Sequence, residues 1–238
     1  MKDFQLYSLK DLMEDFYVSE ISSSLALEID CIDYKDSQEI IVDGKPFETL
    51  LSERQTSKKE VFRAAESRVL NYLQSFTCEK NQDVQDFLHD AEKSIRMQKK
   101  SVARTYMIID SVNDEIAAYF AIAFKPIILE KDHELSKSKV KKLPIHTDEE
   151  GTIEIIPTIL IGQIGRADGY SKDDIDLEDI LDYIFGIINI VKAYIGGKVV
   201  LVEVNNEPKL VEHYKKYGFE KIQESSDMSQ LMQFVNHY

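Results

Sequence analysis

The sequence predicts a mixed α/β (α+β) fold with a mostly antiparallel sheet and flanking helices. Helical and strand-like apolar patterns alternate along most of the chain. Two β-rich runs, residues 155–166 and 198–204, enclose an amphipathic helix over residues 176–194. A crossover of this kind joins parallel strands with a right-handed connection. Short connections elsewhere favour antiparallel hairpins.

Composition bounds the class of protein. The chain has 238 residues, of which 43% are hydrophobic and 30% charged, and its formal net charge is −14. So acidic a surface makes nucleic acid an unlikely partner, because binding to phosphates depends on Lys and Arg. No apolar run reaches the length of a bilayer span, the first residues lack a secretory signal, and Cys31 and Cys78 have no metal-site spacing. We therefore expect a cytoplasmic protein with no membrane partner and no metal.

The first third differs from the rest and predicts an N-terminal extension of unknown function over residues 1–70, followed by a domain over residues 71–238. The apolar spacing of residues 3–17 is helical. Residues 39–47 predict a strand, an Asp-Gly turn and a return strand. A helix is expected over residues 57–76, opened by a capping box.

The second part predicts alternating elements. The expected strands cover residues 72–78, 103–109, 115–124, 154–165, 198–204, 219–223 and 228–235. The expected helices start at Asn81 or Asp83, at Asp176 and at Pro208. Pro157 suggests a bulge in the central strand. Residues 126–150, rich in lysine, predict a solvated insertion or a mobile flap near the substrate.

The loop after the central strand is the first candidate for ligand binding. In open sheets, ligands bind beyond the carboxyl ends of strands where neighbours diverge. Residues 166–172 lie at such an end and offer N–H groups near a helix start, which suits a pyrophosphate.

Three segments of the second half occur in an order that resembles the GNAT family of acetyl-CoA-dependent N-acetyltransferases, small bacterial type. They are Gly162-Gln-Ile-Gly-Arg166, Asn205-Asn206 and His213-Tyr-Lys-Lys-Tyr-Gly-Phe219. The resemblance covers about residues 72–236. It implies a GNAT-like sheet whose central parallel strands splay apart to hold acetyl-CoA as co-substrate.

The resemblance also implies the residues that bind the cofactor. The pantetheine arm would pair with main-chain groups of the central strand, and the pyrophosphate would meet the following loop. These positions are Gln163, Ile164, Gly165, Arg166, Gly169, Tyr170, Ser171 and Lys172. Asn206 would hydrogen-bond the cofactor arm or cap the helix at Pro208. The loop departs from the family pattern, because Gly169 stands almost alone beside Asp173, Asp174 and Asp176.

Tyr214 is the predicted catalytic residue, because the family places a tyrosine here as the acid that protonates the leaving thiolate. A core aromatic is the alternative. Glu154 is the first candidate for the base that takes the proton of the amine, and Glu203 is the second. Each glutamate has an ordinary strand or surface role as its alternative.

The predicted function is N-acetyl transfer from acetyl-CoA to an amine, by direct attack in a ternary complex. The acceptor is a small molecule or a protein, and a homodimer stays open as the assembly. Two alternatives remain: a non-catalytic CoA-binding or regulatory protein on a degenerate scaffold, and a toxin-like aminoacyl-tRNA acetyltransferase.

Overall fold

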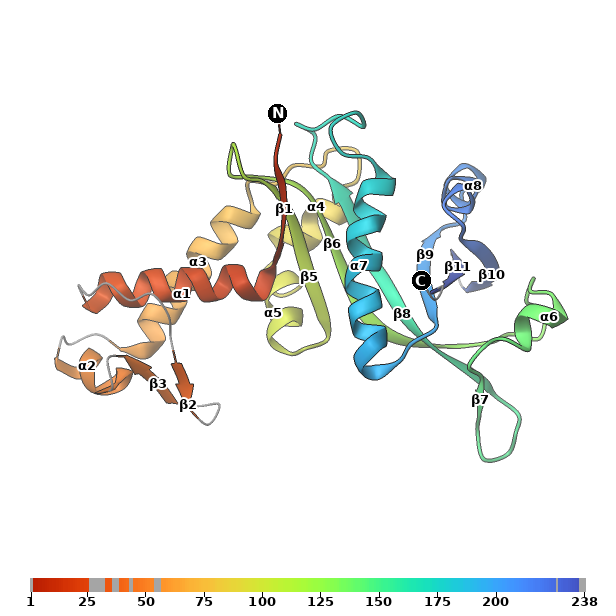
Figure 1. Ribbon diagram of the computed structural model, residues 1–238, viewed down its shortest axis with the longest axis horizontal. Helices are drawn as coiled ribbons and strands as arrows, with labels where there is room; N and C mark the ends of the chain where they lie inside the picture. Colours follow the sequence, from red (N-terminus) through yellow and green to blue (C-terminus); the bar gives the residue numbers. More distant parts are fainter. Residues whose placement is uncertain are drawn as a thin grey trace.

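The computed structural model describes residues 2–25, 33–35, 39–42, 45–53, 57–225 and 227–235. Its main body is an eight-stranded sheet with the order β1-β5-β6-β8-β9-β11-β10, and β7 pairs with β8 (Figure 1). Within this sheet β8 and β9 are parallel and the other pairs are antiparallel. The predicted mixed, mostly antiparallel architecture with a central parallel pair is thus confirmed.

The strands are β1 (Phe4–Ser8), β2 (Asp33–Lys35), β3 (Glu39–Val42), β4 (Lys45–Pro46), β5 (Ala103–Asp110), β6 (Glu115–Ile128), β7 (His146–Thr147), β8 (Glu154–Arg166), β9 (Val199–Asn205), β10 (Glu220–Ser225) and β11 (Met228–Phe234). The helices are α1 (Leu9–Leu25), α2 (Phe47–Glu53), α3 (Lys58–Leu73), α4 (Gln82–His89), α5 (Ser94–Lys99), α6 (Lys137–Val140), α7 (Leu177–Ile195) and α8 (Pro208–Lys216). None of the helices in the described ranges is both long enough and apolar enough to cross a membrane.

The first residues belong to the main sheet, which corrects two predictions. Residues 4–8 form β1, which pairs antiparallel with β5, and the helix starts only at Leu9. The helical spacing of residues 3–17 also places Phe4 and Leu6 on one face of a strand, so the pattern alone did not separate the two. The predicted boundary at residue 70 therefore does not separate the sheet from what precedes it.

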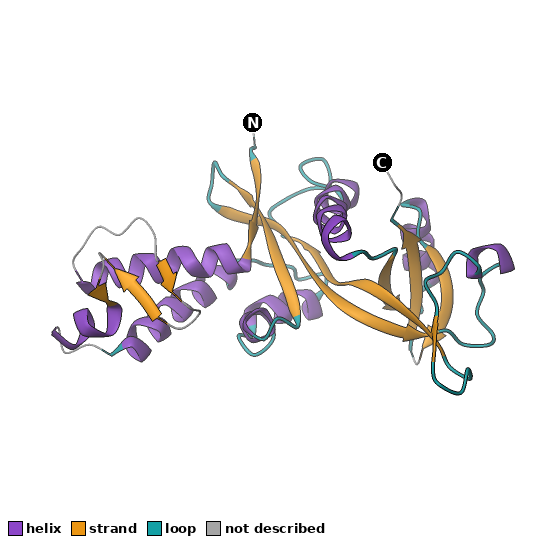
Figure 2. Ribbon diagram, turned by 60° about the horizontal axis from the view of Figure 1, so that its bottom comes forward, coloured by secondary structure: helices purple, strands orange, loops and turns teal. Residues whose placement is uncertain are grey.

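The part of the first third that does stand apart is helical. In both views α1 and α3 lie side by side and project from the sheet together with α2 and the small sheet β2-β3-β4 (Figures 1 and 2). The strands β3 and β4 form the predicted return pair; the expected Asp-Gly turn and Cys31 lie outside the described residues. The capping box of α3 is present as predicted, with Ser57 and Glu60 bonding reciprocally.

Residues 72–78 are not the predicted strand. Tyr72 and Leu73 complete α3, and the chain then turns through a coil whose Phe76 N–H bonds back to the Leu73 carbonyl. The following helix is capped by Asn81, as expected, but it ends at His89 and α5 continues the apolar stripe after a break.

Residues 126–150 are anchored more firmly than a solvated insertion would be. Strand β6 extends to Ile128, and Leu135 and Leu143 are buried in a second core with Ile156 and Met232. The lysines of this segment meet solvent, as predicted, but its leucines hold it against the sheet.

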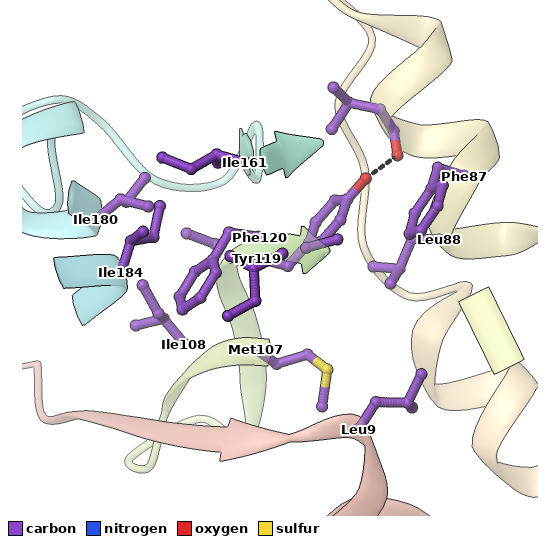
Figure 3. Close-up of a cluster of buried hydrophobic side chains, with 14 of the residues drawn as sticks. Leu9, Phe87, Leu88, Met107, Ile108, Tyr119, Phe120, Ile161, Ile180 and Ile184 are labelled. Atoms are coloured by element: carbon purple, nitrogen blue, oxygen red, sulfur yellow. Dashed lines mark hydrogen bonds between the residues drawn. The ribbon is translucent and has the colours of Figure 1, made fainter. Parts of the chain in front are cut away.

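The main core lies on both faces of the central strands. Because neighbours along a strand point to opposite faces, Phe120 turns toward Ile180 and Ile184 of α7, and Tyr119 turns toward Phe87 of α4 (Figure 3). The Tyr119 hydroxyl donates to a main-chain carbonyl of α4, at Val84. This bond fixes α4 to the sheet through a fully buried side chain.

A glycine makes this close approach of α4 to β8 feasible. A Cβ atom built on Gly165 would lie 2.3 Å from Cγ1 of Val84, and 3.2 and 3.3 Å from the rings of Phe76 and Tyr119. Contacts at such distances force the helix away from the strand. Gly169 contrasts with it, because nothing lies within 4 Å of the same position there.

We expect Gly165→Ala to destabilise the protein by about 1–3 kcal/mol, the usual cost of overpacking a core. The measurement is the midpoint and slope of urea unfolding. The matched control is Gly169→Ala, which adds the same methyl group in open space and should change stability by less than about 0.5 kcal/mol. Equal effects of the two substitutions would show that α4 does not press on β8.

Candidate active site

The two parallel strands at the centre of the sheet pair over only three positions. Ile159 faces Val200, and the last pair joins Ile161 to Val202. Beyond it, β8 continues along β6 as far as Arg166, and β9 continues along β11 as far as Asn205. Strand β8 stays paired with β6 and strand β9 stays paired with β11, but β8 and β9 no longer pair with each other. The main-chain groups on the two facing edges are thus left without a ladder partner.

The pairing stops at a β-bulge. Ala121 of β6 faces Gln163 and Ile122 faces Ile161, so Gly162 is an extra residue in β8. A bulge bends its strand and increases the local twist, which turns β8 away from β9.

The sequence had suggested a bulge at Pro157 instead, but Pro157 pairs in regular register with Pro126. Neither proline has a strand on its other side. The pairing of β6 with β5 ends at Ala123, before Pro126, and the pairing of β8 with β9 begins only at Ile159, after Pro157. A proline is tolerated on such a free edge, because no ladder bond is lost.

Where the strands part, a groove of about 230 Å³ opens. We call it the β8–β9 groove. Its lining comes from the bulge region of β8, the end of β9, the start of α4, helix α8 and Met228. These residues are Asn81, Asp83, Val84, Ile161, Gly162, Gln163, Ile164, Val202, Glu203, Val204, Asn205, Leu210, Tyr214 and Met228.

Several predicted site residues meet in this groove and others do not. Gln163, Ile164 and Tyr214 line it, and Gly165 is the next residue of β8, buried under α4. Glu154 lies at the far end of the same strand, eight residues before the bulge, which is roughly 26 Å at the rise of a strand. The structure therefore does not bring Glu154 to the groove.

Asn205, and not Asn206, faces the groove. The Asn206 side chain accepts a hydrogen bond from the Ser229 hydroxyl at 2.6 Å, so it ties β9 to β11. The residue before Pro208 that caps α8 is Glu207, without a side-chain bond. Both roles predicted for Asn206 are thus replaced by a structural one. The Asn-Asn pair did mark the end of β9, but alternation along the strand decided which asparagine faces the groove.

Tyr214 reaches the groove from the second turn of α8. Its ring packs edge-on against Phe219 at 5.7 Å between centroids. Burial raises the pKa of its hydroxyl above the ordinary value, so the phenol stays protonated at neutral pH. Among the residues that the structure describes, none accepts or donates a hydrogen bond at this hydroxyl. The group can therefore serve as a proton donor to whatever occupies the groove.

Glu203 is the acidic side chain that β9 contributes to the groove. Its carboxylate lies 2.5 Å from Lys125 Nζ and accepts a hydrogen bond from Gln230 Nε2 at 2.8 Å. Gln230 in turn accepts one from Gln223, which bonds the Ile128 carbonyl. The Glu203 side chain is 18% exposed, so its carboxylate is held in place by these partners, and Glu203 is among the residues that line the groove.

The loop over residues 167–176 is folded on itself. Tyr170 is buried, and its hydroxyl donates to Asp110 and Glu115 at 3.1 and 3.2 Å. Ser171 donates from its N–H and its hydroxyl to Asp174 at 2.8 Å. The side chains of Tyr170 and Ser171 therefore serve the fold of the loop and do not point to a ligand.

The other predicted residues of this loop divide between structure and solvent. Arg166 donates to the Ile175 carbonyl at 3.0 Å, so its guanidinium closes the loop. Gly169 and Lys172 are exposed. The groove therefore offers free main-chain edges, whereas most polar groups of the loop are bound within the protein.

Comparisons with known proteins support the fold. No protein-family model matches the chain, and none of the curated proteins matches it either. Solved structures do match. The structure of AtaT complexed with acetyl-methionyl-tRNAfMet has 19% sequence identity and a TM-score of 0.54, over 68% of this chain and 87% of that one. AtaTR bound with AcCoA has 20% identity and a TM-score of 0.51, over 68% and 86%. A mutant of KacT has 15% identity and a TM-score of 0.54, over 68% and 87%.

These likenesses rest on structure and not on sequence. Each covers about two thirds of this chain at a TM-score above 0.5. The chain therefore has the GNAT fold that the order of its motifs implied.

Proposed function

We propose that the chain is an N-acetyltransferase that holds an acetyl thioester in the β8–β9 groove and transfers the acetyl group to an amine. The observation that carries this proposal is the meeting of two features in one place. The parallel pair opens at Gly162, and Tyr214 lines the opening. A solved structure of the same fold, AtaTR, is bound with AcCoA, which supports acetyl-CoA as the donor.

The reaction follows from the groups in the groove. The amine nitrogen attacks the thioester carbonyl, a C–N bond forms, and the C–S bond breaks. Main-chain N–H groups on the free edge of β8 stabilise the negative charge that develops on the carbonyl oxygen. Tyr214 gives its proton to the departing thiolate and regains one from the amine through solvent or a base. Holding both reactants in one groove supplies much of the rate.

Tyr214→Phe is expected to lower the rate of acetyl transfer by about 10²-fold or more at saturating donor, because the thiolate then leaves without a proton donor. The donor affinity should stay the same, since the ring is kept. The measurement is release of free thiol with a panel of amines. The matched control is Tyr217→Phe, three residues on, which should leave the rate unchanged. Unchanged turnover in Tyr214→Phe removes this residue from the mechanism.

The pH dependence of the wild-type rate is a separate check. Because burial raises the pKa of the Tyr214 hydroxyl, the phenol keeps its proton and the rate should not fall between pH 7 and 9.

Glu203 is the base that we propose in place of the distant Glu154. It lines the groove, and its carboxylate is held by Lys125 and Gln230. In this position it takes the proton of the amine, directly or through one water.

We expect Glu203→Gln to lower the transfer rate by about 10²-fold near pH 7 and to lose part of that effect at high pH, where the amine is already deprotonated. The amide can still accept the hydrogen bond from Gln230. The control is Lys125→Met, which breaks the same ion pair but keeps the carboxylate. If both variants lose activity equally and at all pH values, Glu203 acts only through the ion pair.

A second candidate concerns the acceptor. AtaT is solved complexed with acetyl-methionyl-tRNAfMet, so a protein of the same fold holds an acetylated aminoacyl-tRNA. The amine of an aminoacyl-tRNA is chemically the acceptor that our mechanism requires. The net charge of −14 weighs against a broad contact with the tRNA backbone.

The two acceptor classes are separated by a competition experiment. The protein is given radiolabelled acetyl donor together with aminoacyl-tRNA and a mixture of free amines and peptides. Label on the tRNA that mild alkali releases as N-acetylated amino acid assigns the tRNA as acceptor. Because of the acidic surface, we expect label on the small acceptors and less than a tenth of it on the tRNA at physiological salt. The reverse distribution would overturn this expectation and favour the tRNA.

A further inference from the structure

The loop between β8 and α7 bears on how a thioester donor would be held. In a donor such as acetyl-CoA, a neutral acyl-pantetheine arm is joined to a nucleotide through a diphosphate. A diphosphate is bound by free main-chain N–H groups at a helix start, by positive side chains, or by both. Each requirement can be checked against the residues of this loop.

Most N–H groups of the loop are already bound within the protein. Those of Asp168 and Tyr170 donate to the carbonyls of Thr77 and Ala167, and those of Asp174 and Ile175 donate to Ser171. Three more are bound by side chains, those of Ser171, Asp173 and Asp176. Over residues 168–176, this leaves the N–H groups of Gly169 and Lys172 without an acceptor among the described residues.

The first turn of α7 is closed by its own carboxylates. Asp176 accepts from the Asp179 N–H at 3.0 Å, and Asp179 accepts from the Asp176 N–H at 2.9 Å. This reciprocal capping box occupies two of the donors at the helix start, while the N–H groups of Leu177 and Glu178 have no acceptor among the described residues. It also places two negative charges where the helix dipole would favour a phosphate.

The charges of the loop are negative overall. It contains one lysine, Lys172, and five aspartates: Asp168, Asp173, Asp174, Asp176 and Asp179. Two further cations lie at the loop. Arg166 donates to the Ile175 carbonyl at 3.0 Å, and Lys2 is bound to Asp174 at 2.9 Å and lies over the Tyr170 ring at 4.2 Å. Hydrogen bonds from Lys2 and Ser171 hold the pKa of Asp174 at about 2, so this carboxylate is ionised at any pH of interest.

The loop is also fixed in this arrangement from several sides. Asp168 accepts from the Glu79 N–H at 2.8 Å, and Tyr170 is anchored on the buried Asp110. Opening these contacts would remove the Tyr170 hydroxyl from the donors of the buried Asp110 carboxylate, which keeps the Val112 N–H and the Asn113 amide.

We propose that the chain holds its donor by the acyl-pantetheine half alone, and that the nucleotide diphosphate contributes no affinity. The inference rests on the proposed function, because it places the thioester in the β8–β9 groove. It widens the donor class from acetyl-CoA to acetyl thioesters of pantetheine in general. Asp173, Asp174 and Asp176 then act as specificity-determining residues that make the protein indifferent to, or selective against, a charged nucleotide.

The test compares two donors by isothermal titration calorimetry on the whole chain: acetyl-CoA and uncharged S-acetylpantetheine. We expect dissociation constants within threefold of each other at physiological salt. Raising the salt from about 0.02 to 0.5 M should leave S-acetylpantetheine unchanged and should leave acetyl-CoA unchanged or tighten it, because salt screens the repulsion. A tenfold preference for acetyl-CoA, or binding of acetyl-CoA that weakens with salt, overturns the inference but leaves the proposed function intact. If neither thioester binds at millimolar concentration, the proposed function fails and the inference fails with it.

A charge reversal gives an independent readout. Asp173 is exposed and its carboxylate forms no hydrogen bond or ion pair with a described residue, so Asp173→Lys should not disturb the fold. We expect it to tighten acetyl-CoA by about three- to tenfold at low salt without changing S-acetylpantetheine. The control is Glu149→Lys, which makes the same change of net charge in the segment before β8 and should alter neither affinity. Equal effects of the two variants on acetyl-CoA would show that net charge, and not this loop, governs the donor.

Discussion

The site depends on one structural constraint, the end of parallel pairing between β8 and β9 at Gly162. Two strands can part in the middle of a sheet only if each keeps a partner on its other edge. Here β6 holds β8 as far as Arg166, and β11 holds β9 as far as Asn205. The open edges then lie between two well-paired halves of the sheet, and the groove is as rigid as the strands that flank it.

One wall of the groove is set by a second contact, the approach of α4 to β8. Gly165 leaves room for Val84, and the Tyr119 hydroxyl bonds the carbonyl of the same valine. The start of α4, with Asn81 and Asp83, is thereby brought to the groove. The other wall, α8, contributes Tyr214 through an ordinary start at Pro208. A packing contact in the core, made by a valine that also lines the groove, thus determines the width of the site.

Much of this could be read from the sequence, because its patterns are local. The capping box of α3, the hairpins and the order of strands around α7 follow from the spacing of a few residues. The order of the motifs implies that β8 and β9 diverge. The position of the bulge, at Gly162 and not at Pro157, depends on pairing with β6, which the sequence does not show. The same lack of a partner hid β1, whose role is set by pairing with β5 a hundred residues later. Glu154 is predicted as the base because it belongs to the central strand. The pairing register shows that it lies at the opposite end of β8 from the groove.

The two halves of the proposed donor site depend on different properties of the chain. A protein can therefore share this fold and keep one half without the other. The groove for the thioester arm is made by main-chain edges, and any sequence that keeps the bulge keeps those edges. The place for a diphosphate depends on loop residues that leave N–H groups free, and here aspartates occupy them. The divergence of β8 and β9 therefore supports binding of a thioester, while the capped start of α7 argues against tight binding of the nucleotide diphosphate. Both arguments hold together only if the donor is recognised at its reactive end.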